Sequence, residues 1–461
     1  MNSNNLDFVI TEYISKPLDQ NDNHFFSSKL AILDTIGCII EASSHKDVLE
    51  FASKNKLSLN FRNPFKNLTV NESYENISWY LTVLTRWFDY NDTFLAKEWA
   101  HPSDNFGTIY SYFYKNNNYK FYDFVNALTK AYELQGSLCL GTSLNKSGYD
   151  HVFYVKLASG SVFSHLVNDG DMDATRRTVN NILLDGPNLR AYRHFPNVGK
   201  RKSWAAADAS KRGIELAIIS SFKDEIYETV QNEVKWGFES SFLDNSKLEF
   251  GKELDNWVIQ NILFKVLFPA EFHGQSAVEA AIELSEEFNK NINKVKKVNI
   301  YTHEPAIRII SNKEILKNAS DRDHSLEYMV AAALIYGDLT YEMYEESFPG
   351  FEKINDLRKK IFVTEETQYT KDYYEFTKRH ISNALEIVYD DNSISEKIII
   401  ENPIGHPSRR KEAVPLLKDK FLRNVKSVFG TEKGLEIWDK IINLEKNDDL
   451  NMFFNILNED E

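Results

Sequence analysis

The sequence predicts a mainly α-helical protein with a large all-helical domain and a smaller α+β domain. At 461 residues the chain is long enough for two or three domains. Apolar residues recur with helical spacing through roughly the first 290 residues, and strand-like runs appear only between about 290 and 400. A helical pattern returns at 434–457, as expected for a tail that rejoins the first domain.

Three segments carry the helical pattern most clearly. Residues 122–136 place an apolar stripe on one face, with Asp123 expected as the helix cap. Residues 203–222 form a helix rich in small side chains, which permits a neighbouring backbone to approach closely. A third helix is expected at 276–290, where Ser276 and Glu279 have the spacing of a capping box.

The α+β part is marked by short runs of β-branched and aromatic residues. Residues 294–303 read as a strand, and 384–402 read as a hairpin around an Asp-Asp-Asn turn. Residues 324–339 lie between them and have a helical composition. This arrangement of strands and helix predicts a small α+β unit.

Composition limits the classes of function. The formal charge is −14, whereas nucleic-acid binders usually have a basic domain. No apolar run approaches the roughly 20 residues needed to span a bilayer, and the first residues do not resemble a signal peptide. The two cysteines, Cys38 and Cys139, are too few for a disulfide framework. We therefore expect a cytoplasmic protein without nucleic-acid or membrane partners.

One stretch departs from the acidic composition. Between Arg190 and Arg212 the chain has seven basic residues and a single acid, Asp208. Lys200, Arg201 and Lys202 lead into the small-residue helix, where the helix dipole disfavours cations. Two interpretations are open: a solvated loop, or an anion site at the helix N-terminus to which Arg190 and Arg193 add bidentate donors.

Two histidines lie in positions suited to chemistry. His101 precedes a helix start at which Ser103 or Asp104 is expected to cap, and His151 follows a turn that contains glycine. Asp89 and Asp92 lie upstream of His101, and such a carboxylate could either orient the histidine or simply cap a helix. For each histidine a structural role is the alternative. HExxH and Cys-x-x-Cys motifs do not occur, so the sequence gives little support for a metal site.

Seven segments together resemble the MmgE/PrpD family, in the family's order and from about residue 33 to 421. They are HPSDNFG, AYELQG, GYDHVFYVKLAS, LRAYRHFPNVGKRKSWAAADASKR, LFKVLFPAEFHGQSAVEAA, DRDHSLEYMVAA and PIGHPSRR. The resemblance implies a homodimer whose subunit has a helical domain and an α+β lid domain, with the active site between them. We accordingly expect a helical domain at 1–275, completed by 401–461, and the lid at 276–400.

The arginine-rich stretch and FPAEFH resemble the family members that remove water from 2-methylcitrate to give 2-methyl-cis-aconitate in propionate breakdown. Citrate is a further possible substrate of such an enzyme. Carried over residue by residue, the resemblance implies catalytic roles for His101, His151, Asp89 and Lys202. The residues expected to bind substrate are Thr93, Arg190, Arg193, Lys200, Arg201, Lys265 and His273.

The last two of these residues depart from the pattern of related decarboxylases. Those relatives have Lys-x-x-Pro-x-His, whereas here Lys265 and His273 each lie four positions from Pro269. The departure argues against a decarboxylase. The nearest alternative function is a decarboxylase or isomerase of cis-aconitate-like acids with the same fold. A more distant alternative is an RNA- or anion-binding protein, since aromatic and basic residues interleave at 193–204.

The implied reaction explains the basic stretch. Removing a proton beside a carboxylate builds further negative charge on it, which cations stabilise. A base must take that proton and an acid must protonate the leaving hydroxide, and either histidine suits either role. An iron–sulfur cluster needs several cysteine thiolates, and two are too few unless subunits share one. We therefore expect dehydration without a metal or other cofactor.

Overall fold

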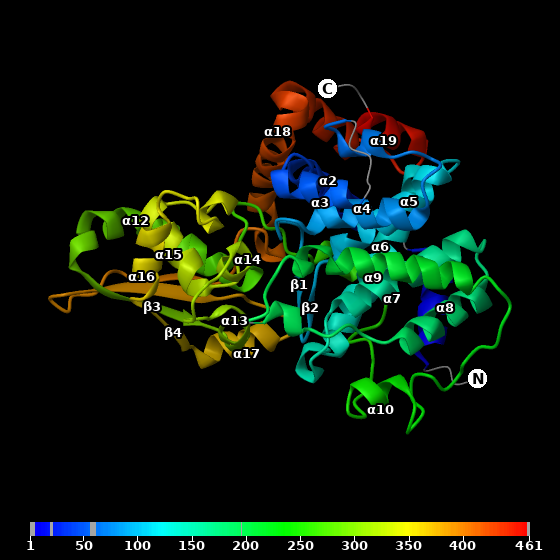
Figure 1. Cartoon of the computed structure of the whole chain (residues 1–461), viewed down its shortest axis with the longest axis horizontal. Coiled ribbons are helices and arrows are strands. Elements are labelled where there is room, and N and C mark those ends of the chain that lie inside the picture. The colour runs from blue at the N-terminus through cyan, green and yellow to red at the C-terminus, as the bar shows by residue number, and fades with distance from the viewer. Residues whose placement is uncertain (1–4, 19–21, 56–60, 195, 459–461) are drawn as a thin grey trace. The chain divides into compact units, whose positions relative to one another are not determined.

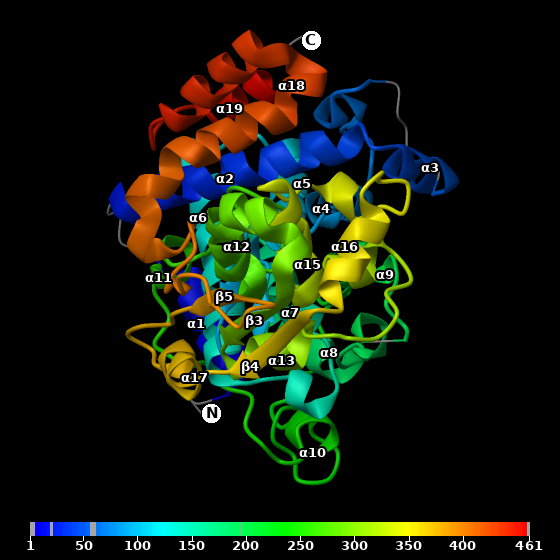
Figure 2. The same ribbon diagram turned by 90° about the vertical axis from the view of Figure 1, so that its left-hand side faces the viewer.

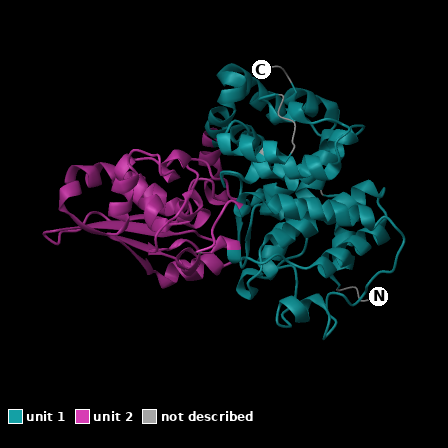
Figure 3. Ribbon diagram, in the orientation of Figure 1, with its two compact units in different colours: residues 1–191, 201–262, 417–461 teal, residues 192–200, 263–416 magenta. Residues whose placement is uncertain are grey.

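The computed structural model describes residues 5–18, 22–55, 61–194 and 196–458, and it is mainly α-helical with two small sheets. Two compact units are distinguished (Figures 1 and 3). Unit 1 comprises Met1–Ala191, Arg201–Ile262 and Leu417–Glu461, and unit 2 comprises Tyr192–Lys200 and Leu263–Leu416. The domain limits after residues 275 and 400 stay a prediction. No helix in the described ranges is long and apolar enough to cross a membrane.

Unit 1 is helical apart from a two-stranded antiparallel hairpin. Its helices are α1 (Leu6–Ser15), α2 (Asp22–Ser43), α3 (Lys46–Lys54), α4 (Tyr74–Arg86), α5 (Phe106–Lys115), α6 (Phe121–Gly141), α7 (Val152–Val167), α8 (Met172–Asp185), α9 (Arg201–Ile219), α10 (Phe238–Phe242), α11 (Trp257–Gln260) and α19 (Leu450–Leu457). The hairpin consists of β1 (Phe94–Leu95) and β2 (Trp99–Ala100). α18 (Arg410–Ile442) begins in unit 2, continues into unit 1, and bends at Gly430.

Helices α4, α7 and α9 pack together in unit 1. α7 and α9 approach closely at two glycines: a Cβ at Gly213 would lie 2.8 Å from the carbonyl oxygen of Lys156 and 3.2 Å from the nitrogen of Gly160. Since real Cβ atoms do not approach a backbone this closely, both positions require glycine. The small-residue helix predicted at 203–222 is confirmed as α9, and so is its close contact with a neighbouring backbone.

α18 lies against α2, as Figure 2 shows, and α19 contacts α6. Lys420 of α18 donates to Asp34 of α2 at 2.6 Å and to the carbonyl oxygen of Tyr90 at 2.6 Å, and both charged side chains are fully buried. Burial opposes the charged form of the amine, but Asp34 holds the pKa of Lys420 above its usual value. The predicted helical tail is confirmed and is divided between α18 and α19. The buried Lys420 of α18 holds the main chain at Tyr90 through its hydrogen bond to the carbonyl oxygen.

Unit 2 contains a four-stranded sheet of order β4-β3-β5-β6, in which β3 and β4 are parallel and the other pairs are antiparallel. The strands are β3 (Val295–Thr302), β4 (Ile361–Glu365), β5 (Asn383–Tyr389) and β6 (Ile398–Ile400). Its helices are α12 (Gln275–Asn291), α13 (Glu304–Ile310), α14 (Ala319–Arg322), α15 (Leu326–Tyr336), α16 (Phe351–Arg358) and α17 (Thr367–Tyr374). The predicted strand at 294–303 and the hairpin at 384–402 are confirmed.

Two predicted helix caps are wrong. α6 begins after Lys120, and Asp123 takes part from the third helical position by accepting the N–H of Lys120 at 2.9 Å. At α12 the cap is Gly274. Ser276 donates instead to the carbonyl oxygen of Ile381, and Glu279 accepts from the N–H of Ile404 and from Arg409. The spacing predicted that these two side chains would cap the helix, but they form hydrogen bonds with residues distant in the sequence instead.

Candidate active site

The β1–β2 hairpin brings two of the predicted residues together. Its register pairs Phe94 with Ala100, so Thr93 and His101 stand opposite each other one position further along. The hydroxyl of Thr93 lies 3.3 Å from Nδ1 of His101. Both side chains are buried. The hairpin therefore gives a local structural cause for the proximity of these two side chains.

The hydrogen bonds of His101 indicate the tautomer of its neutral ring. Its Nδ1 lies 2.7 Å from the main-chain oxygen of Asp92. Because a carbonyl oxygen only accepts, Nδ1 must carry the hydrogen, which leaves the lone pair of the neutral ring on Nε2. Nε2 lies 3.6 Å from Oδ1 of Asp89. The ring can therefore accept a proton at Nε2, beside a carboxylate that stabilises the resulting cation.

Asp89 is held in place by a buried arginine. Arg86, at the end of α4, donates from Nη1 to Asp89 at 2.7 Å and to Asn91 at 2.7 Å, and its Nε lies 3.5 Å from Asp104. The backbone of Asp89 is left-handed, with φ at 51°. Among residues other than glycine this conformation is tolerated best by Asp and Asn. Arg86 and this unusual backbone together direct the carboxylate toward His101.

Asp92 has a different role from Asp89. Its Oδ1 accepts the N–H of Ser103 at 3.0 Å and the hydroxyl of Ser103 at 2.7 Å. It thus caps the turn Pro102–Asn105, and the prediction that Ser103 or Asp104 caps this turn is wrong. Burial raises the pKa of Asp92 to about 6, although both bonds from Ser103 lower it. Of the two aspartates, it is Asp89 whose carboxylate faces the ring.

His151 lies next to His101, with their ring centroids 6.0 Å apart. It stands at the N-terminus of α7, after the predicted turn, in which Gly148 has a φ of 84°. Its Nδ1 lies 3.6 Å from Oδ1 of Asp150, which also accepts the N–H of Val152 at 3.1 Å. Each imidazole of the pair therefore has its own carboxylate.

A main-chain hydrogen bond joins Arg190 to the turn that precedes His151. Its N–H donates to the carbonyl oxygen of Gly148 at 3.1 Å, and its guanidinium lies 4.0 Å from Asp150 and 4.8 Å from the ring centroid of Trp99. Beside Trp99, burial raises the pKa of Glu98 to about 7, although Arg190 lowers it. The first residue of the basic stretch is thus a buried cation beside the histidine pair.

Lys202 and Arg201 belong to the first turn of α9, which packs against α4 and the Pro102–Asn105 turn. Lys202 is buried, and its neighbour Ser203 donates to the carbonyl oxygen of Trp87 at 3.3 Å. Arg201 is more exposed, lying over the ring of Trp204 and 3.5 Å from Asp208. α9 therefore begins beside the chain that leads to Asp89.

Four predicted substrate-binding residues lie in unit 2: Arg193, Lys200, Lys265 and His273. Lys265 and His273 are buried. His273 lies between Glu271, at 2.9 Å from its Nδ1, and the hydroxyl of Tyr373, at 3.1 Å from its Nε2. Burial alone would raise the pKa of Glu271, but His273 lowers it below its usual value.

Sequence reasoning did not identify Arg86, Asp150, Trp99 or Lys420. Asp150 was detectable, because it directly precedes His151. Arg86 was not, since nothing in the helical pattern of α4 distinguishes a buried arginine from a solvated one.

Within the described residues, no cluster of three or more His, Cys, Asp or Glu side chains could hold a metal ion. The arrangement suits proton transfer at two imidazoles beside a site for an anion.

Comparison with known proteins gives matches over most of the chain. Residues 13–251 match the model of the MmgE/PrpD N-terminal domain, and residues 268–446 match that of the MmgE/PrpD C-terminal domain. A 2-methylcitrate dehydratase of Escherichia coli (strain K12) is 36% identical over 94% of this chain and 91% of its own length. A probable 2-methylcitrate dehydratase of Saccharomyces cerevisiae is 34% identical, over 91% and 85%. A 2-methylcitrate dehydratase of Cupriavidus necator is 33% identical, over 90% and 89%.

Proposed function

The chain belongs to the MmgE/PrpD family, and we propose that it is a hydro-lyase that converts 2-methylcitrate into 2-methyl-cis-aconitate and water. The observation that carries the proposal is the histidine pair, in which His101 and His151 lie side by side and each has a carboxylate. The names of the similar bacterial and yeast proteins support the same reaction.

His101 is the base in this proposal. With Nδ1 bound to the main-chain oxygen of Asp92, its Nε2 takes the proton from the carbon beside a substrate carboxylate. The electron pair of the broken carbon–hydrogen bond forms the new double bond. Asp89 stabilises the imidazolium that results, since its carboxylate already lies near Nε2.

His151 is the acid. The hydroxyl leaves the adjacent carbon with the electron pair of the carbon–oxygen bond, and a proton from His151 converts it into water. The carboxylate of Asp150, 3.6 Å from Nδ1, favours the cationic form of the ring before the transfer. His101 gains one proton and His151 loses one, so a proton must return from His101 to His151 before the next turnover.

The basic residues hold the three carboxylates of the substrate. Arg190 is placed next to His151 by its backbone bond to Gly148, and Lys202 stands on the helix that begins beside the chain leading to Asp89. In the proposal Lys202 stabilises charge that develops during proton removal, and Thr93 contacts substrate beside His101. Arg193, Lys200, Arg201, Lys265 and His273 complete the set of substrate-binding residues.

The proposal extends to the assembly. Unit 2 would act as the α+β lid over the histidine pair, in a cytoplasmic homodimer. One similar protein, from Yarrowia lipolytica, is named as mitochondrial, so relatives are not confined to one compartment.

The test is a spectrophotometric assay on purified, EDTA-treated protein. On addition of 2-methylcitrate, the ultraviolet absorbance of the new conjugated double bond should rise, faster than with citrate. The rate should not fall after EDTA treatment. Carbon dioxide release from cis-aconitate, with no reaction of 2-methylcitrate, would replace this proposal with a decarboxylase. A folded protein that is inactive on all three acids would contradict the proposal outright.

A further inference from the structure

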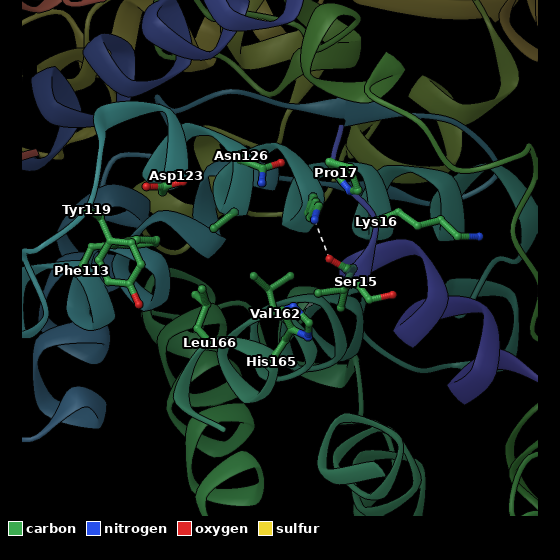
Figure 4. Close-up of a pocket in the computed structure, with 13 residues that line it drawn as sticks. Ser15, Lys16, Pro17, Phe113, Tyr119, Asp123, Asn126, Val162, His165 and Leu166 are labelled. Carbon is green, nitrogen blue, oxygen red and sulfur yellow. Dashed lines mark hydrogen bonds between the residues drawn. The ribbon is translucent and has the colours of Figure 1, made fainter. Parts of the chain in front are cut away.

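Unit 1 contains a pocket whose lining shares no residue with the candidate active site. It has a volume of about 320 Å³, within the lower range of small-molecule sites. Figure 4 shows its walls: Asp123 and Asn126 of α6 on one side, and Val162, His165 and Leu166 of α7 on the other. Ser15 at the end of α1 and the following Lys16 and Pro17 close one end, and Phe113 and Tyr119 lie at the other.

Lys130 of α6 is the distinctive residue of this pocket. The side chain is buried, and its amine donates to the main-chain oxygen of Ile14 at 2.5 Å. An ammonium group has three donors, so this bond leaves donors available. Among the described residues, Lys130 forms no ion pair within 4.0 Å, and burial lowers its pKa to about 8. Buried charges in proteins are normally paired, so this buried amine favours an anionic partner.

His165 adds a second group that favours an anion. It lies in the last turn of α7, and its buried Nδ1 has no hydrogen-bond partner among the described residues. Burial lowers the pKa of His165, and the charge of Lys130 lowers it further. An anion between Lys130 and His165 would oppose the lowering of the His165 pKa by Lys130, because it would offset the repulsion between the two cations.

The remaining walls select against a fully hydrated ion. Apolar side chains line the pocket on several elements: Ile14, Pro17, Phe113, Ala127, Val162 and Leu166. Among the described residues that line the pocket, Asp123 is the only one with a carboxylate, and its Oδ2 already accepts the N–H of Lys120. A ligand that satisfies the pocket therefore has one anionic group for Lys130 and a short apolar body for these walls.

We propose that this pocket binds a small organic monoanion, a carboxylate with a short aliphatic or aromatic body, through Lys130 and His165. α7 connects the pocket to the active site, because His151 stands at its N-terminus and His165 lies about 21 Å further along the helix. The site is proposed independently of the dehydration reaction, and its occupancy is measurable without turnover.

The experiment measures binding of hexanoate by isothermal titration calorimetry. Benzoate, inorganic phosphate and hexan-1-ol are tested in parallel. We expect millimolar or tighter binding of hexanoate and benzoate and none of phosphate or hexan-1-ol, since the pocket needs both the charge and the apolar body. Binding of phosphate without hexanoate, or of no probe at all, would overturn the proposal.

Variants locate the binding. Lys130→Met should weaken hexanoate binding roughly tenfold or more, because a charge-assisted hydrogen bond is lost. Lys29→Met is the matched control, since Lys29 is also buried and donates to main-chain oxygens, of Ile442 and Leu444, but lies outside the pocket. Arg190→Gln tests whether hexanoate binds in the active site instead, and this variant should bind normally. Equal affinity of the Lys130→Met and wild-type proteins would refute the site.

A second measurement is independent of whether Lys130→Met folds. Hexanoate should raise the midpoint of the His165 titration followed by proton NMR in the wild-type protein, with His165→Gln used to assign the resonance. An anion beside His165 stabilises the protonated ring, which gives the direction of the shift. An unchanged titration at saturating hexanoate would also refute the site.

Discussion

The imidazole Nδ1 of His101 donates a hydrogen bond to the main-chain oxygen of Asp92 at 2.7 Å. This single contact fixes which ring nitrogen carries the hydrogen, and so it directs the basic nitrogen toward Asp89. The contact depends on the β1–β2 hairpin, whose register also places Thr93 beside the ring. The local fold thus selects the tautomer of the neutral His101 ring.

Replacing His101 with alanine should reduce kcat on 2-methylcitrate by about 100- to 10,000-fold, the usual contribution of a positioned base. The protein should stay folded with a lower thermal unfolding midpoint, because the substitution removes a buried ring and leaves the main-chain oxygen of Asp92 without its donor. The ultraviolet assay and a thermal melt check both parts. His165→Gln, which alters a histidine outside the site, serves as the control. Near-normal activity of His101→Ala would remove His101 from the mechanism.

Asp89→Asn should lower kcat by about 100-fold or more while KM changes less. Asparagine tolerates the left-handed backbone at this position, so the substitution removes the charge without disturbing the chain. Arg86 keeps Asn91 and Asp104 as partners. Steady-state kinetics and circular dichroism provide the measurement. A variant with full kcat would show that the carboxylate does not assist His101.

Much of the fold could be predicted from sequence because helical periodicity and turn residues are local signals. The helix at 122–136, the small-residue helix, the strand at 294–303 and the hairpin near 390 all depend on neighbouring residues. β4 was not predicted, because Ile361–Glu365 has a mostly exposed pattern and becomes a strand by pairing with β3, some 60 residues earlier. Sequence patterns do not encode such distant pairing directly.

The candidate site shows the same limit. Spacing placed Asp89 and Asp92 equally well for orienting His101, and only the hairpin geometry separates a carboxylate that faces the ring from one that caps Ser103. Arg190 was identified by its charge, but its attachment to Gly148 follows from the antiparallel bridge between Tyr149 and Leu189. The sequence shows which residue types are suited to catalysis. The residues that each of them contacts depend on the tertiary structure and could not be predicted.

Arg190→Lys should raise KM for 2-methylcitrate by about 10-fold or more, with a smaller effect on kcat. Lysine keeps the charge but loses the planar fork that binds a carboxylate and stacks on Trp99. Initial rates over a range of substrate concentrations separate the two constants. Arg212→Lys is the matched control, since Arg212 lies in the same basic stretch but pairs with Asp185 and Glu215. Equal KM values for both variants would contradict a substrate contact by Arg190.

Lys420→Met should destabilise unit 1 by about 3–5 kcal/mol, because Asp34 would be left as a buried charge without its partner. Lys418→Met, on the same helix, removes an exposed pair with Asp439 and should cost less than about 1 kcal/mol. Urea unfolding of the two variants gives the comparison. Adding Asp34→Leu to Lys420→Met should recover much of the loss. If both single variants unfold at the same urea concentration, the buried pair does not stabilise the chain at Tyr90.

Asp92→Asn should make unfolding less dependent on pH. Burial raises the pKa of Asp92 from 3.8 to about 6, so between these values the folded protein binds a proton that the unfolded chain has lost. The free energy of unfolding contributed by Asp92 therefore falls as pH rises through this window, and at pH 7 the ionised side chain costs about 3 kcal/mol. An asparagine oxygen can still accept both bonds from Ser103.

Urea unfolding at about pH 4 and about pH 7.5 should show equal stabilities at the lower pH and a more stable variant at the higher one. A difference between the proteins that does not change with pH would mean that Asp92 is ionised throughout this range.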